Sequence, residues 1–163
     1  MLSDLEQRRV WEGLLGAETR SQYFADLCGR YQRKQKYLTW GILLLSSGAF
    51  AAFVTHWASQ TVPWLPAVLA LSTAGLSLFS LVAKNERNSI DCNELHFKQN
   101  TLAREFEDLW DDMYSDLAAT KLKELEVRAI EYSRTATSFP NRAAVMLKWE
   151  NHVILRRCRI AEE

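Results

Sequence analysis

Residues 37–83 read YLTWGILLLSSGAFAAFVTHWASQTVPWLPAVLALSTAGLSLFSLVA, and this segment decides the fold of the 163-residue chain. It contains no Asp, Glu, Lys or Arg, whereas the rest of the chain carries 20 basic and 20 acidic residues. Two apolar blocks of 20 residues lie within it, 38–57 and 64–83. As a helix that rises about 1.5 Å per residue, each block spans about 30 Å, the thickness of a bilayer's hydrocarbon core. The two blocks therefore predict two transmembrane helices.

Two other interpretations of this segment are less consistent with it. Buried helices of this length in a water-soluble fold usually carry a polar stripe, but the only ionisable side chain here is His56. A cleaved signal peptide would have a shorter apolar segment near the N-terminus and small residues at its cleavage site. Here the first block begins after a charged segment of 37 residues and lacks such a site. We therefore expect a transmembrane hairpin.

Basic residues flank the uncharged segment on both sides, whereas the connection 58–63 carries no charge. Because positively charged flanks stay in the cytoplasm, both termini are predicted to be cytoplasmic. Tyr37 and Trp40 then lie at the inner interface, and Trp57 and Trp64 lie at the outer one. The basic flank consists of Arg30, Arg33, Lys34, Lys36, Lys84 and Arg87.

The remaining chain predicts helices only, so the expected fold class is all-α. We expect an N-terminal cytosolic helical segment over 1–36, the hairpin over 37–83 and a cytosolic helical domain over 84–163. Residues 84–138 contain neither Pro nor Gly and predict one long helix. The sequence TSFPN at 137–141 ends it, and a second helix is predicted over about 142–159.

The long helix carries an apolar stripe at steps of three, four or seven residues. One amphipathic helix cannot bury such a stripe alone, so it is predicted to pack in a helical bundle or to hold an oligomer together. The predicted oligomer stripe consists of Leu102, Phe106, Leu109, Met113 and Leu117.

Small and hydroxylated residues form faces on both apolar blocks. Such faces let helix backbones approach closely, and hydroxyl groups can bond across helices. They either pack the hairpin and its oligomer or line a water-filled path, which requires several copies because two helices cannot enclose a pore. The candidate residues are Ala70, Thr73, Ser77 and Ser80 in the second block, and Ser46, Gly48 and Ala52 in the first.

Sequence motifs for catalysis or for cofactor and metal binding are absent. The three cysteines are widely spaced, the three histidines match no metal-ligand spacing, and no phosphate-binding glycine loop occurs. Glu107 and Asp111 share a helix face in the acidic run 105–116, but such runs are usually solvated. Zero net charge argues against direct nucleic-acid binding. We therefore expect no enzyme, no cofactor and no metal site.

The arrangement resembles the SLATT family, whose members are two-transmembrane effectors of bacterial conflict systems. The likeness lies in RYQRKQKYLTW at 30–40, in the uncharged hairpin and in EFEDLWDDMY at 105–114, and it extends from about residue 18 to 155. The resemblance implies a location in the bacterial inner membrane. It also implies that a nucleotide-signalling or sensor protein encoded nearby triggers the effector.

Two functions follow as expectations. The first is an oligomeric pore-forming or membrane-disrupting effector of antiviral defence, gated through its cytosolic helices by a partner or a nucleotide signal. Its partners would be the lipid bilayer and further copies of itself. The alternative is a membrane-anchored scaffold whose helical module docks other proteins without conducting ions.

Overall fold

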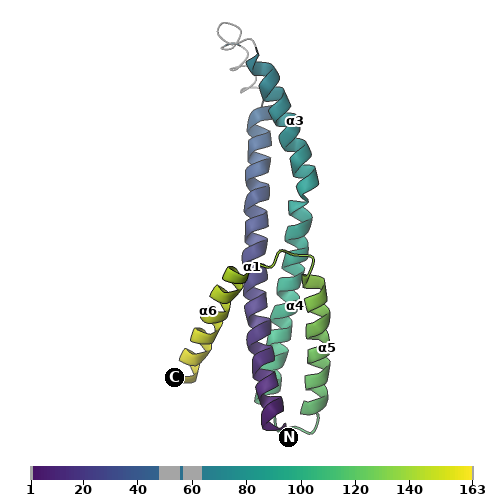
Figure 1. Cartoon of the computed structure of the whole chain (residues 1–163), viewed down its shortest axis with the longest axis vertical. Helices are drawn as coiled ribbons and strands as arrows, with labels where there is room; N and C mark the ends of the chain where they lie inside the picture. Colours follow the sequence, from purple (N-terminus) through teal and green to yellow (C-terminus); the bar gives the residue numbers. More distant parts are fainter. Residues whose placement is uncertain (1, 48–55, 57–63, 163) are drawn as a thin grey trace. The chain divides into compact units, whose positions relative to one another are not determined.

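A computed structural model of the chain describes residues 2–47, 56 and 64–162. Its helices are α1 (Asp4–Ser46), α3 (Leu65–Ala83), α4 (Asn85–Asp111), α5 (Ala118–Ala136) and α6 (Ala143–Glu162) (Figure 1). No strand occurs among the described residues. The prediction of an all-α fold is therefore confirmed.

The helices divide into two compact units. The bundle unit comprises Met1–Leu27 and Asp91–Glu163, and the apolar unit comprises Cys28–Ile90. Both α1 and α4 contribute residues to each unit. The sequence predicted boundaries at residues 36 and 84 instead, because the segment without charged residues begins and ends there. The two units are defined by contacts between residues, and these divide the chain after Leu27 and after Ile90.

The predicted single helix over residues 84–138 is wrong. α4 ends at Asp111, residues 112–117 form turns, and α5 begins at Ala118. The turn brings α5 back along α4, so that Leu122 and Leu125 join Leu102 in one buried cluster. A single helix would leave these leucines without partners. Before α4, Lys84 has a left-handed backbone conformation, with φ 45° and ψ 31°, and separates it from α3.

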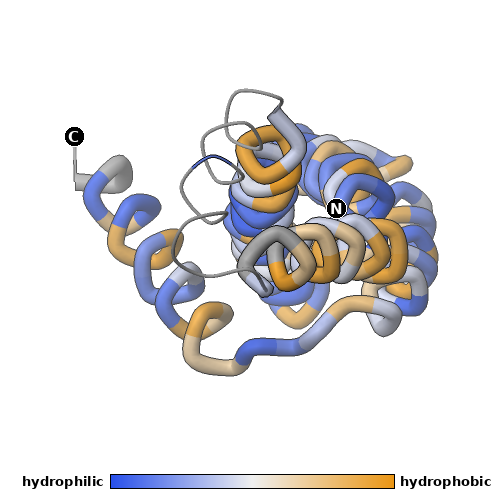
Figure 2. Tube along the Cα trace, turned by 90° about the horizontal axis from the view of Figure 1, so that it is seen from above, coloured by the Kyte–Doolittle hydropathy of each residue, from blue (hydrophilic) through white to orange (hydrophobic). Residues whose placement is uncertain are grey.

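The C-terminal part of the chain follows the prediction. The turn at 137–141 ends α5, and α6 begins at Ala143. Hydrophobic and hydrophilic residues are interspersed along α6, the helix next to the C-terminus in Figure 2. Val153 of α6 is buried.

A capping box begins α1. The Glu6 carboxylate accepts hydrogen bonds from the Ser3 backbone amide at 2.9 Å and from the Ser3 hydroxyl at 2.8 Å. In return, the Glu6 amide donates to the Ser3 hydroxyl oxygen at 3.4 Å. These bonds satisfy helix N–H groups that lack intrahelical partners. They also hold the pKa of Glu6 below its ordinary value, and the backbone bond has the largest effect.

The core of the bundle unit lies between α1, α4 and α5. Phe106 of α4 is 1% exposed and packs directly against Gly13 of α1. A β-carbon at Gly13 would lie 2.6 Å from two atoms of the Phe106 ring, so only glycine fits at this position. Trp11 and Trp110 lie beside this cluster, with ring centroids 5.2 Å apart.

Candidate functional site

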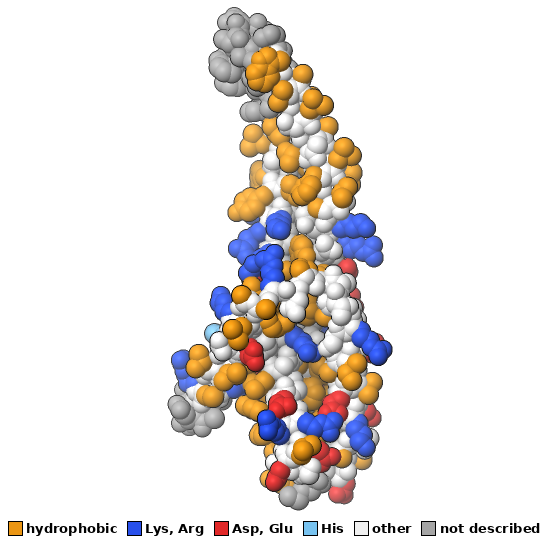
Figure 3. Space-filling view, viewed as in Figure 1, with side chains coloured by type: hydrophobic (Ala, Val, Ile, Leu, Met, Phe, Trp, Pro, Cys, Tyr) orange, Lys and Arg blue, Asp and Glu red, His pale blue; other side chains and the backbone are white. Residues whose placement is uncertain are grey.

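Large apolar side chains of the apolar unit lie on its surface (Figure 3). Leu71, Leu78 and Leu81 of α3 are 64% to 76% exposed, and Leu43 and Leu44 of α1 are more than half exposed. Monomeric soluble proteins rarely expose an apolar surface this extensive, and such surfaces usually mark contact with a membrane or another protein.

The buried residues of the apolar unit are small or polar. Among its described residues, only Cys28, Asn85 and Ser89 are buried. The Cys28 sulfur lies 3.4 Å from the Ser89 hydroxyl oxygen, and Gln32 donates to that sulfur at 3.4 Å. This unit therefore reverses the distribution of a water-soluble fold, in which large apolar side chains fill the interior.

Three of the candidate hydroxyl residues, Thr73, Ser77 and Ser80, are half-buried in the apolar unit. Ser77 donates to the Thr73 carbonyl oxygen at 2.9 Å, so its hydroxyl is satisfied within α3. Ala70 and Ser46 are exposed, whereas Gly48 and Ala52 lie outside the described residues. Thr73, Ser77 and Ser80 therefore share the packed side of α3.

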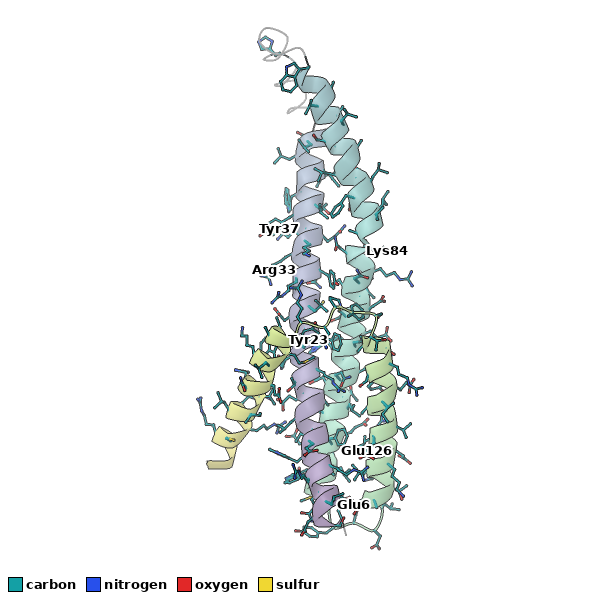
Figure 4. All side chains as sticks on the ribbon, viewed as in Figure 1. Glu6, Tyr23, Arg33, Tyr37, Lys84 and Glu126 are labelled. Carbon is teal, nitrogen blue, oxygen red and sulfur yellow. The ribbon has the colours of Figure 1, made fainter. Side chains whose placement is uncertain are left out.

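The predicted basic flank lies at the surface of the same unit. Arg33, Lys34, Lys36, Lys84 and Arg87 are exposed, and Arg30 is half-buried. Arg33 and Lys84 extend away from their helices, and Tyr37, one turn beyond Arg33, is 74% exposed (Figure 4). Cationic and aromatic side chains therefore adjoin the exposed apolar surface.

Among the described residues, no helix combines the length and the apolarity needed to cross a bilayer. Of the first predicted span, residues 48–55 and 57 lie outside the described residues, as does the whole connection to the second span, residues 58–63.

The predicted oligomer stripe contributes to the core of its own chain. Leu102, Phe106 and Leu109 are each at most 2% exposed, and Met113 packs against the same cluster. Leu117 differs, because it is 65% exposed. Helices of one chain therefore account for the burial of Leu102, Phe106 and Leu109 without a second copy.

Several members of the acidic run form ion pairs with other helices. Glu105 pairs with Arg128 of α5, and Lys121 of α5 lies 3.7 Å from Asp112. Glu107 accepts a hydrogen bond from Arg157 of α6 at 2.5 Å. The predicted solvated face is thus also an attachment surface for α5 and α6. The described residues contain no cluster of metal-binding side chains.

A buried carboxylate that the sequence analysis missed attaches α6. The Glu18 side chain is 8% exposed and pairs with both Arg156 and Arg157, the latter at 2.9 Å. Nothing in the local sequence distinguishes Glu18 from the solvated acids, because its partners lie more than 130 residues away along the chain.

Ser21 of α1 and His96 of α4 bring a hydroxyl group and an imidazole together in the bundle unit. The Ser21 hydroxyl lies 3.0 Å from His96 Nδ1, and the Ser21 carbonyl oxygen lies 2.9 Å from the same nitrogen. A proton on Nδ1 bonds to that carbonyl oxygen, so this nitrogen does not accept the hydroxyl proton. The contact holds α1 against α4.

Between α1 and α5, the bundle unit has a groove of about 610 Å³. Glu12, Gly13 and Arg20 line it from α1, and Ile130 and Arg134 line it from α5. Arg9 of α1 and Glu126 of α5 form an ion pair at one end of it.

Comparisons with models of protein families, with curated proteins and with solved structures find no match for this chain.

Proposed function

We propose that residues 37–83 form a hairpin in the inner membrane of a bacterium, with both termini in the cytoplasm. The observation that carries this proposal is the reversed distribution of side chains in the apolar unit. In water, each large apolar side chain left exposed forgoes about 1.5–3 kcal/mol of burial energy. Lipid tails contact these side chains without that cost, and the exposed basic flank meets anionic headgroups, at about 1 kcal/mol per cation.

Several copies of the hairpin assemble, in this proposal, into a pore that permeabilises the membrane. The resemblance to SLATT effectors supports this step, and the small residues of α3 are compatible with it. Serine and threonine hydroxyls bonded to their own helix are compatible with an apolar environment and with closely packed helices. The absence of charged residues between 37 and 83 argues against a selective transporter.

The bundle unit gates the pore in response to a partner protein or a nucleotide signal. This role requires an element with two arrangements of similar energy. α6 is a suitable element, because ion pairs from Arg156 and Arg157 contribute to its attachment. A ligand that competes for these pairs would shift α6 between attached and released states.

A second candidate is a membrane-anchored docking module that conducts no ions. The half-burial of Thr73, Ser77 and Ser80 favours it, because these hydroxyls pack within a single chain and do not face outward. On this alternative, the hairpin only tethers the bundle unit to the membrane.

Membrane potential after induction of the full chain in bacteria separates the two functions. A pore-forming chain depolarises the cells, and simultaneous change of Thr73, Ser77 and Ser80 to Leu abolishes depolarisation. The matched control changes Ala67 and Ala74 to Leu, because both alanines are exposed on the same helix. Control cells should depolarise like wild type, and all variants should stay in the membrane fraction. Membrane-bound wild-type chain without depolarisation would instead establish the docking module.

A further inference from the structure

The half-buried Arg20 and the exposed Arg134 line one end of the α1–α5 groove. Arg20 is half-buried and donates from Nη1 to the Ser133 hydroxyl at 2.8 Å. Ser133 in turn donates to the Ala129 carbonyl oxygen at 2.8 Å. Within the described part of the chain, no carboxylate forms an ion pair with Arg20 or Arg134. A guanidinium has five N–H donors, so most donors of Arg20 remain unused.

This arrangement differs from that of other arginines that join the helices of the bundle unit. Arg9, Arg128 and Arg157 each pair with a carboxylate on another helix. A half-buried guanidinium with only a neutral partner has lost hydration without a compensating charge. An anion between Arg20 and Arg134 would supply that charge.

The groove is polarised along its length. Contacts of Arg9 with Glu126 and of Arg20 with Ser133 fix how α1 and α5 align. Glu12 and Glu126 therefore lie toward one end, while Arg20 and Arg134 lie toward the other. Eight residues separate Glu12 from Arg20, or about 12 Å along the helix. Ala129 and Ile130 form an apolar wall between the two ends.

We propose that this groove binds a soluble small molecule that carries a phosphate group. The phosphate lies between Arg20 and Arg134, where planar guanidinium groups bind its oxygens with paired hydrogen bonds. An apolar part lies against Ala129 and Ile130, and hydroxyl or amino groups at the far end donate to Glu12. The volume of about 610 Å³ suits a ligand of this size. This site belongs to the bundle unit and does not depend on pore formation.

The probe for the experiment is phenyl phosphate, added to the full chain in a phosphate-free detergent and followed by the phosphorus NMR signal. The wild-type chain should broaden and shift this signal in a saturable manner. Arg20→Gln should weaken binding about tenfold or more, because a charge-assisted bond pair is lost. Arg20→Lys, which keeps the charge but loses the planar fork, should weaken it less. Arg104→Gln is the matched control, because Arg104 is an exposed arginine outside the groove.

Three outcomes would overturn the proposal. The first is equal binding by wild type and Arg20→Gln when circular dichroism shows both to be folded. The second is equal weakening by Arg104→Gln, which would indicate unspecific attraction to positive charge. The third is displacement of phenyl phosphate by phosphatidic acid in the micelles without the reverse displacement, which would assign the groove to a lipid headgroup.

Discussion

The close contact between Gly13 and Phe106 gives a quantitative test of the bundle unit. In Gly13→Ala, the new β-carbon would lie 2.6 Å from Cε1 and Cζ of the Phe106 ring and 3.1 Å from Cδ1. The ring is 1% exposed and belongs to the buried cluster, so it cannot move without disturbing its neighbours. Overpacking of this kind costs about 1–3 kcal/mol.

Gly16→Ala is the matched control for this substitution. It lies one turn further along α1, and a β-carbon there would meet no atom within 4 Å. Both substitutions gain about 0.5–1 kcal/mol because alanine loses less backbone entropy in a helix than glycine does. The difference between the variants therefore isolates the steric cost, about 1–3 kcal/mol, with Gly16→Ala the more stable.

Thermal unfolding of the full chain in detergent, followed by circular dichroism at 222 nm, measures this difference. For a chain of this size, about 1 kcal/mol corresponds to a change in Tm of about 2–4 °C. Gly16→Ala should raise the Tm slightly, and Gly13→Ala should lower it. Combining Gly13→Ala with Phe106→Leu should cost less than the sum of the two single changes, because the smaller side chain removes the clash. Equal Tm values for the two alanine variants would refute the packing of α1 on α4.

Three further predictions concern the same unit. Leu109→Arg should lower the free energy of unfolding by about 3 kcal/mol or more, because it buries an unpaired charge. Leu117→Arg, at an exposed position, should change this free energy by less than about 0.5 kcal/mol. Unfolding in urea measures both values. Glu18→Gln should weaken the attachment of α6 by about 2 kcal/mol and speed proteolysis at residues 137–142. The control variant Glu150→Gln, changed at an exposed site, should be cleaved at the wild-type rate. Because the folded pKa of Glu6 is lowered, the capping box stabilises α1 above the ordinary glutamate pKa of 4.5 and loses that effect as pH falls through the lowered value. The protection of amides in the first turn of α1 against hydrogen exchange, taken relative to the intrinsic rate at each pH, should therefore fall in acid, and Glu6→Gln, which lacks the titrating carboxylate, should remove this pH dependence.

The break after α5 and the helix that follows it agree with the local sequence. Pro140 interrupts the helical structure after α5, and the spacing of apolar residues predicts α6 close to its observed bounds. The turn between α4 and α5 was missed, because residues 112–117 contain neither Gly nor Pro. That turn is stabilised by the packing of Leu122 and Leu125 against α4, a contact that periodicity alone does not reveal.

The same limit applies to the candidate sites. Periodicity correctly indicated that Phe106 and Leu109 lie on a buried face, but it did not indicate which helices cover them. Arg20 and Ser133 come together although 113 residues separate them, so no motif could have marked the groove. By contrast, the exposed apolar side chains of α3 follow directly from a segment that lacks charge.

In the proposed function, the exposed side of α3 contacts lipid. A spin label at Leu78→Cys in the full chain, reconstituted in bilayers, tests it through collisions with oxygen and with a water-soluble nickel chelate. Cys158 is replaced by Ser because it is the exposed cysteine, and Val127→Cys on α5 provides the aqueous reference. We expect the label at position 78 to collide with oxygen and not with nickel, and the label at position 127 to collide with nickel. Equal nickel collision at both positions would contradict it.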